Sequence, residues 1–198
     1  MIDTKQKKRR NIVVFIIVMC LAVLGALGAY YQYMKKQQMQ ETVHTPTTET
    51  EKLIAKDLRV GYPETPKEVM KLFGRYIQCI YNKTLSEDEF SSLVGQLRIL
   101  YCEDLKNQNE VQDMERDIRA EIKSYKKNGK KIVNFTIDDD SKYQYKTIDN
   151  REMVYVKYSF FMRESDKYST WNQRAILVKE DDKWKIMGFG SAPAKAAK

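Results

Sequence analysis

The stretch KIVNFTID, residues 131–138, marks the point at which the hydrophobic pattern of the chain changes its period. Before it, apolar residues recur every three or four positions, which is the spacing of one helix face. Within it, Val133, Phe135 and Ile137 alternate with other residues, and this alternation predicts a strand with one buried face. The order of the two patterns predicts helices first and a sheet afterwards, which is an α+β layer fold.

Three amphipathic helices are expected before this strand. Residues 65–68, TPKE, have the pattern of a capping box with proline at the first helical position, and Ser86 with Glu89 forms a second capping box. A third helix is expected over residues 110–127, and Gly129 should end it. The apolar positions expected to face the sheet are Val69, Phe73, Tyr76, Ile77 and Ile80, then Phe90, Leu93, Val94, Leu97, Leu100 and Tyr101, then Val111, Met114, Ile118, Ile122 and Tyr125.

The second half of the chain predicts an antiparallel meander of about five strands. In the last of them, the alternation of residues 183–186, KWKI, places Trp184 and Ile186 towards the helices and both lysines in water. The strands are expected at residues 131–138, 143–147, 152–162, 174–179 and 183–189, with a polar loop at residues 164–170.

An apolar segment without a charged side chain, residues 12–31, precedes all of this. About 20 residues at a rise of 1.5 Å each match a bilayer core of roughly 30 Å, and a cluster of tyrosines follows, so a transmembrane helix is predicted at residues 12–33. Five basic residues lie before the segment, and only Lys35 and Lys36 follow it closely. The positive-inside rule therefore predicts a single-pass cell-membrane protein with a cytoplasmic N-terminus, its C-terminal domain outside, and the lipid bilayer as a partner. A signal peptide cleaved before Ala29 is the alternative.

The predicted fold class is thus α+β: one N-terminal transmembrane helix, then three helices packed on a curved, cone-like antiparallel sheet of about five strands. Leu53, Ile54 and Leu58 form an apolar patch that predicts a short helix near the end of a polar stalk. The expected segments are a basic cytoplasmic tail at 1–11, the transmembrane helix at 12–33, the stalk at 34–60, the α+β outer domain at 61–190 and a disordered tail at 191–198.

The last predicted hairpin carries a resemblance. Residues 181–189, DDKWKIMGF, are similar to the closing hairpin of nuclear transport factor two-like domains, also called SnoaL-like or cystatin-like domains. Residues 62–69, YPETPKEV, and residues 79–82, CIYN, resemble a family of uncharacterised membrane-anchored proteins from Gram-positive anaerobic bacteria. The resemblance covers most of the chain from Tyr62 onwards. It implies a cone-shaped fold and a membrane location, and it implies no activity. The chain departs from the usual order of helices in this fold, because all three helices are expected before the first strand.

The composition excludes several chemistries. His44, the single histidine, lies in the predicted stalk, so the outer domain has no histidine base and no Ser-His-Asp triad. Cys79 and Cys102 alone cannot complete a zinc site. About half of the formal net charge of +8 precedes the apolar segment, and elsewhere basic and acidic residues are interleaved, which disfavours nucleic acid as a partner. No catalytic residue, cofactor or metal is predicted.

Carboxylates and cysteines leave alternatives open. Acidic residues of turns and loops are usually solvated, and the run DDDS at residues 138–141 lacks the ligand spacing of a calcium loop. Cys79 and Cys102 either form a disulfide or are reduced core residues, of which the second is expected. The acids that a carboxylate enzyme would have to draw on are Asp149, Glu152, Glu164 and Asp166.

Aromatic residues suggest a binding surface. The chain has 13 tyrosines, many of them in the half predicted to form the sheet. One face of the sheet must pack on the helices. If the other face keeps its aromatic residues, it is a binding surface or a dimer interface. The alternative is that the aromatic residues are part of the hydrophobic core. The candidate binding face consists of Tyr143, Tyr145, Tyr155, Tyr158 and Trp171.

These features predict a membrane-anchored extracytoplasmic binding or assembly module without catalysis. Its sheet or the mouth of its cone would bind a protein partner, a second copy of the chain or a small apolar ligand. One alternative is a carboxylate-based isomerase or hydrolase in the cone, and another is a bitopic component of a secretion or conjugation machine. A buried, unpaired Asp or Glu in a pocket would favour the enzyme, whereas a shallow pocket and an exposed aromatic sheet would favour the module.

Overall fold

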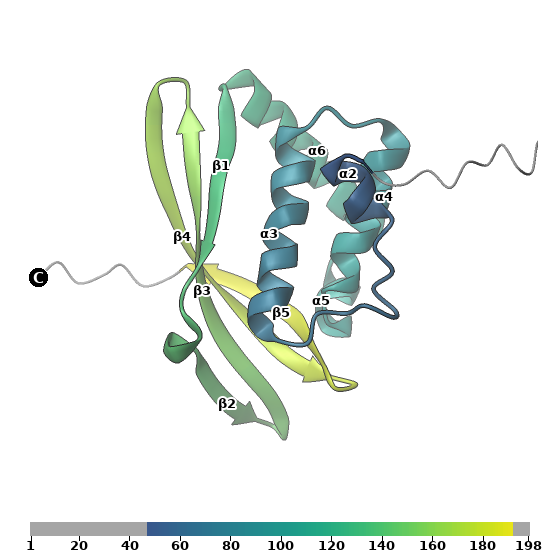
Figure 1. The fold of residues 1–198 in the computed structure, drawn as a ribbon, viewed down its shortest axis with the longest axis vertical. Helices are drawn as coiled ribbons and strands as arrows, with labels where there is room; N and C mark the ends of the chain where they lie inside the picture. The colour runs from purple at the N-terminus through teal and green to yellow at the C-terminus, as the bar shows by residue number, and fades with distance from the viewer. Residues whose placement is uncertain (1–46, 192–198) are drawn as a thin grey trace, which may run out of the picture. The chain divides into compact units, whose positions relative to one another are not determined.

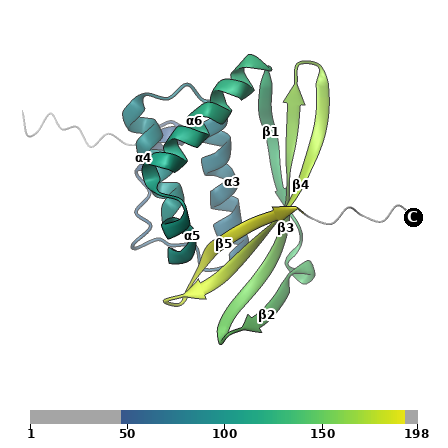
Figure 2. The ribbon, with the colours of Figure 1, turned by 180° about the vertical axis from the view of Figure 1, so that it is seen from behind.

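The computed structural model describes residues 47–191, which form a layer of helices followed by one sheet (Figure 1). Figures 1 and 2 show the helices together on one side of the upper part of the sheet. The helices are α2 (Glu49–Ile54), α3 (Pro66–Asn82), α4 (Glu87–Ile99), α5 (Glu103–Gln108) and α6 (Val111–Lys127), with a single 3-10 turn, η1 (Asp140–Lys142); the strands are β1 (Lys130–Ile137), β2 (Gln144–Ile148), β3 (Arg151–Glu164), β4 (Lys167–Glu180) and β5 (Lys183–Ser191).

The predicted fold class needs correction. No helix within residues 47–191 is long and apolar enough to cross a membrane. The predicted fold class, a transmembrane helix followed by three helices on a sheet, is therefore wrong. What the structure shows is a mixed α+β fold, with five α-helices within the described residues and a five-stranded antiparallel sheet. The transmembrane helix predicted at residues 12–33 lies outside the described residues. The cellular location inferred from it therefore stays a prediction.

The predicted helix starts are confirmed. Thr65 precedes α3, its side chain accepts a hydrogen bond from the backbone N–H of Glu68, and the Glu68 carboxylate accepts one from the backbone N–H of Thr65. Ser86 and Glu89 make the same reciprocal pair before α4. Such boxes satisfy two of the N–H groups that a helix leaves unpaired at its start. After α6, Gly129 has a φ of 60°, a left-handed conformation that glycine adopts without strain.

The helical layer is larger than predicted. α2 forms within the segment assigned to the stalk, and Leu53 and Leu58 are buried in the main core, so the packed domain begins before Gly61. α5 was not predicted, because it is short and none of its residues is buried. Its N-cap is Cys102, whose sulfur accepts a hydrogen bond from the backbone N–H of Leu105 at 3.4 Å.

The sheet has the strand order β1-β3-β4-β5, and β2 pairs with β3 beyond the end of β1. All pairs are antiparallel. The loop expected at residues 164–170 is wrong, because β4 starts at Lys167, opposite Glu164. The turn takes only Ser165 and Asp166, with Ser165 at a φ of 52°, and the polar residues after it are strand residues exposed to solvent.

A β-bulge changes which residues of β1 face the helices. The register shifts between Ile132 and Asn134, so Val133 has no partner on β3. Ile132 is buried and Val133 is exposed, which corrects the expected alternation of Val133 with Phe135. An extra residue in one strand moves the side chains on one side of it to the opposite face.

Strand β3 supplies the sheet side of the core. Its residues alternate from Val154 to Met162, and every second one belongs to the main core, which also contains residues of α3 and α4. Residues opposite each other in an antiparallel pair share a face, so Leu177 of β4 and Ile186 of β5 join this helix-facing side. A second, smaller cluster on the other face joins Met153 and Val178 to Cys102, Leu105 and Met187.

The last strand is only partly as expected. Ile186 is fully buried, and Trp184 on the same face is half-buried against Tyr145, with ring centroids 6.0 Å apart. Lys185 is not in open water: its Nζ donates to the carbonyl of Ile99 at 2.6 Å and lies 4.1 Å from the centre of the Tyr62 ring. Burial lowers the pKa of Lys185 to about 8. A lysine at a helix C-terminus binds carbonyls that would otherwise lack partners.

Two helix glycines give a matched stability test. A Cβ added at Gly74 in α3 would overlap the ring of Phe135, whereas a Cβ at Gly95 in α4 meets nothing within 4 Å. We expect Gly74→Ala to lower the free energy of unfolding by about 1–3 kcal/mol through overpacking. Gly95→Ala should raise it by about 0.5–1 kcal/mol, because alanine loses less backbone entropy. Urea unfolding followed by circular dichroism measures both, and equal effects of the two changes would contradict the packing of α3 on β1.

Buried tyrosines predict loss of stability at high pH. Burial raises the pKa of Tyr76 to about 12 and raises the pKa of Tyr101 and Tyr158 further. In the unfolded chain tyrosine ionises near pH 10, so above that pH the unfolded state binds fewer protons than the folded state. The stability contributed by these groups is complete below pH 10 and falls as the pH rises towards the folded pKa values. Tyrosinate absorbance should therefore rise together with the loss of circular dichroism, and ionisation of all tyrosines in a still folded chain would contradict this burial.

Candidate functional site

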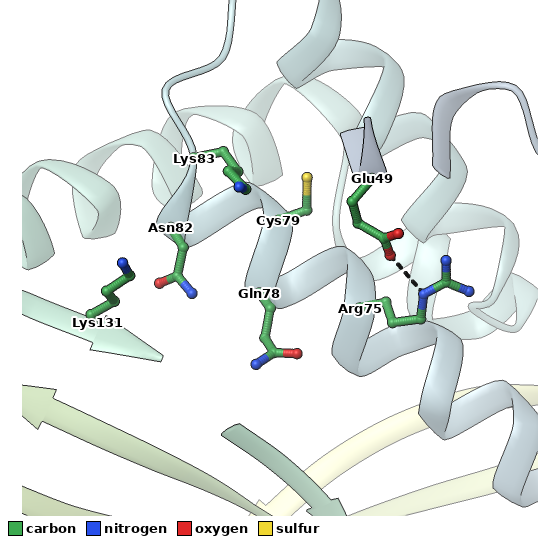
Figure 3. A pocket seen from close by; sticks show the side chains of 7 residues that line it. All are labelled: Glu49, Arg75, Gln78, Cys79, Asn82, Lys83 and Lys131. Carbon is green, nitrogen blue, oxygen red and sulfur yellow. Dashed lines mark hydrogen bonds and ion pairs between the residues drawn. The ribbon is translucent and has the colours of Figure 1, made fainter. Parts of the chain in front are cut away.

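A shallow pocket of about 280 Å³ opens between α2, α3 and the start of β1 (Figure 3). Two further depressions, of about 320 and 360 Å³, lie on the same side of α3 and share Arg75 with it. Pockets for small molecules usually span about 300–1,000 Å³ and enclose most of the ligand, so each of these is at the small end. The first is lined by Glu49, Arg75, Gln78, Cys79, Asn82, Lys83 and Lys131.

Most polar groups of the pocket in Figure 3 already have partners. Arg75 donates to the Glu49 carboxylate at 2.8 Å, which neutralises the acid in the lining. The amide of Asn82 donates to the carbonyl of Ile132 at 2.7 Å and accepts from the N–H of the same residue at 3.0 Å. Gln78, Lys83 and Lys131 remain for a ligand, so the pocket offers cationic surface and no general base.

Cys79 is a core residue rather than a nucleophile. Its sulfur lies 3.3 Å from the hydroxyl of Thr50, and both side chains are buried. Burial raises the pKa of the Cys79 thiol, which keeps it protonated at neutral pH. Cys102 is buried in another part of the domain, and the two cysteines are free, as expected.

The five aromatic residues predicted as one binding face do not lie on one face. Tyr158 is buried on the helix side, and Tyr143 packs on the same core with a hydroxyl that has no hydrogen-bond partner among the described residues. Tyr145 is exposed and contacts Trp184, whereas Tyr155 lies on the opposite face under the ammonium of Lys146. Alternation along β3 separates Tyr155 from Tyr158, and the remaining member, Trp171, lies far along β4 from the others.

Two exposed aromatic residues outside the predicted binding face form a stacked pair. Phe161 and Tyr168 stack in parallel on the face away from the helices, with ring centroids 5.5 Å apart and an angle of 11° between the planes. Val133 is exposed beside Asn134, the residue opposite Phe161. Tyr168 was missed because residues 164–170 were expected to be a loop. The two polar residues Ser165 and Asp166, flanked by Glu164 and Lys167, were the signal for a tight hairpin.

The acidic residues weighed as catalytic or calcium-binding groups lie at the surface. Asp139 accepts from the backbone N–H of Ser141 at 3.1 Å and so begins η1, and Asp140 pairs with Lys67 at 2.9 Å. Within residues 47–191, no group of three His, Cys, Asp or Glu residues is placed to hold a metal ion. The candidate general bases Asp149, Glu152, Glu164 and Asp166 are all exposed.

Fold and site together define a small α+β domain with shallow basic depressions on one helix and an uncovered aromatic end of its sheet. The chain belongs to the protein family described as "Domain of unknown function (DUF6715)", whose sequence profile matches residues 2–189. No curated protein sequence matches the chain significantly.

The burial of both cysteines predicts that neither reacts in the folded state. In the full chain carrying Cys20→Ser, an aromatic disulfide reagent should label no thiol under native conditions and two after unfolding in denaturant. Ser92→Cys, at an exposed position of α4, is the control that should react at once. Rapid native labelling, or a gain of two hydrogens in mass on reduction, would contradict two buried free thiols.

Proposed function

We propose that this chain is a non-catalytic binding module that contacts another protein through residues 161–172, here called the β3–β4 tip. The observation that carries the proposal is the exposure of three large aromatic residues in this short segment. Tyr168 is 59% exposed, Trp171 56% and Phe161 38%. Exposed aromatic side chains that cluster mark interaction surfaces, because tyrosine, tryptophan and phenylalanine are enriched where proteins meet.

The position of the tip supports the same function. Figure 1 shows β1 between the end of the β3–β4 hairpin and the helices. The helix-facing residues of β3, from Val154 to Met162, are buried, whereas Phe161 and Tyr168 lie on the opposite face of the sheet. Burial of aromatic surface here therefore requires atoms from another molecule, at a gain of about 25 cal/mol for each Å² of apolar surface.

No specific observation favours the carboxylate enzyme. That function needs a buried, unpaired Asp or Glu to hold a raised pKa at a reacting centre. Within residues 47–191 every Asp and Glu is at least partly exposed, and the pocket acid Glu49 pairs with Arg75. The depressions on α3 provide cations and amides, which suit weak anion binding rather than proton transfer.

A photo-crosslinking amino acid at Tyr168 tests the proposed function in the full chain inside cells. Under irradiation we expect one covalent adduct of defined mass, since a bound partner lies against the exposed ring. The same amino acid at Tyr145 is the matched control, because that ring is also exposed on the sheet but lies outside the tip. Loss of the adduct in a Phe161→Ser background would confirm the patch. No adduct at Tyr168, or the same adducts from both positions, would overturn the binding function.

A further inference from the structure

One edge of the sheet is bare along the tip. β4 runs from Lys167 to Glu180, but β5 pairs with it only from Gln173 onwards. Residues 167–172 therefore have β3 on one side and, among residues 47–191, no strand on the other. All six are exposed to solvent. A bare edge presents a row of unpaired N–H and C=O groups, which is a template for another strand.

The fold closes the neighbouring edges with specific contacts. The edge of β1 is occupied by the Asn82 amide, which pairs with both backbone groups of Ile132, and by the bulge at Val133. The edge of β5 is covered by the chain before α5: the N–H of Ile186 donates to the carbonyl of Leu100 at 2.7 Å, and the N–H of Cys102 donates to the carbonyl of Ile186 at 2.9 Å. Side-chain caps, bulges and covering segments are devices that prevent pairing between sheets.

β4 has none of these devices along residues 167–172. The segment, KYSTWN, has no proline and no bulge, and its single charged residue, Lys167, lies at the end next to the turn. The other strand without a cover, β2, has only five residues and carries Lys146 at its centre, both of which weaken an edge as a template. The bare edge of β4 is therefore the place where the sheet can grow.

Aromatic side chains flank this edge on both faces. Trp171 pairs with Phe160 and so lies on the helix-facing side, whereas Tyr168 pairs with Arg163 on the other side. An added strand would extend both faces of the sheet and cover both rings. Cross-strand contacts of this kind contribute to pairing in addition to the backbone hydrogen bonds.

We propose that residues 167–172 of two copies of this chain pair in antiparallel fashion about a two-fold axis, so that the two sheets become one. This inference rests on the proposed function and names its partner. An antiparallel edge is complementary to itself, because a two-fold axis perpendicular to the sheet brings each unpaired N–H opposite a C=O. A foreign strand would need a matching register and charge, whereas a second copy supplies both.

The register centred on Ser169 fits the side chains. It places Ser169 opposite Ser169 of the second copy, and Lys167 opposite its Trp171. Lys167 and Trp171 lie on the same face of β4, since their partners on β3 are Glu164 and Phe160. An ammonium group beside an indole is attractive, and the two-fold axis repeats this contact. No two like charges meet in this register.

A charge placed in the edge tests the proposal in the full chain. We expect the wild type to sediment as a concentration-dependent dimer, and Trp171→Lys to weaken the dimer by at least tenfold, since two added ammonium groups then lie close to Lys167 of the opposite copy. Val60→Lys is the matched control, because Val60 is also an exposed apolar residue but lies outside the sheet. Circular dichroism checks that each variant is folded. A monomeric wild type, or a dimer that Trp171→Lys leaves unchanged, overturns the proposal.

Disulfide trapping tests the register. In the Cys20→Ser chain, Ser169→Cys should give a covalent dimer on mild oxidation, whereas Ser92→Cys on α4 should not.

If the full chain stays monomeric while a chain ending at Ser191 forms the Ser169→Cys dimer, residues 192–198 block the edge and the proposal is overturned for the natural chain. If the adduct at Tyr168 has a mass other than twice that of the chain, the binding function stands and the second copy is the wrong partner.

Discussion

The pairing of β3 along its whole length is the constraint on which this structure depends. β3 has 14 residues and pairs with β1 and β2 on one side and with β4 on the other. At a rise of about 3.3 Å per residue it spans roughly 46 Å, whereas the 17 residues of α3 span about 26 Å at 1.5 Å each. The helices therefore cover only part of the sheet. On β3 the core reaches as far as Met162, so Phe161 and Tyr168 are uncovered because they lie on the face of the sheet away from the helices.

Backbone contacts tie the helical layer to the sheet at its edges as well as through the core. Asn82, at the end of α3, binds both backbone groups of Ile132, and the segment after α4 pairs with Ile186 of β5. Lys185 adds a bond from β5 to the last turn of α4. These contacts leave few backbone groups unpaired at β1 and β5, and an unpaired buried group would cost about 1–3 kcal/mol. The helices and the sheet should consequently unfold as one unit.

The chemistry of the described residues supports the proposed binding function. The cysteines are buried, the acids are exposed or paired with basic residues, and the buried tyrosine hydroxyls have pKa values raised by burial. Reacting centres usually combine a cleft with groups whose pKa values are moved towards neutrality. Here the half-buried lysine, Lys185, is held between a carbonyl and an aromatic ring, which gives it a structural role.

Local sequence determined the parts of this protein that depend on neighbours in the chain. The capping boxes at Thr65 and Ser86, the end of α6 at Gly129 and the order of helices before strands all follow from such signals, and the structure confirms them. Within the described residues, α2 was expected only as a short helix from an apolar patch, and α5 had no signal, because six-residue helices are stabilised by tertiary contacts.

Only the tertiary structure decided which faces are covered and which edges are bare. The bulge at Val133 reversed the side on which one residue of β1 points, and the two-residue turn at Ser165 converted an expected loop into the tip. The five aromatic residues chosen from composition separated because alternation and strand length, rather than residue type, place a side chain on a face. Aromatic content alone left open whether these residues form a binding surface or plain core. The exposure of Phe161 and Tyr168 follows from the face of the sheet on which they lie, and that of Trp171 from its place on β4 before β5 begins to pair. Strand pairing decides both, and no local pattern contains it.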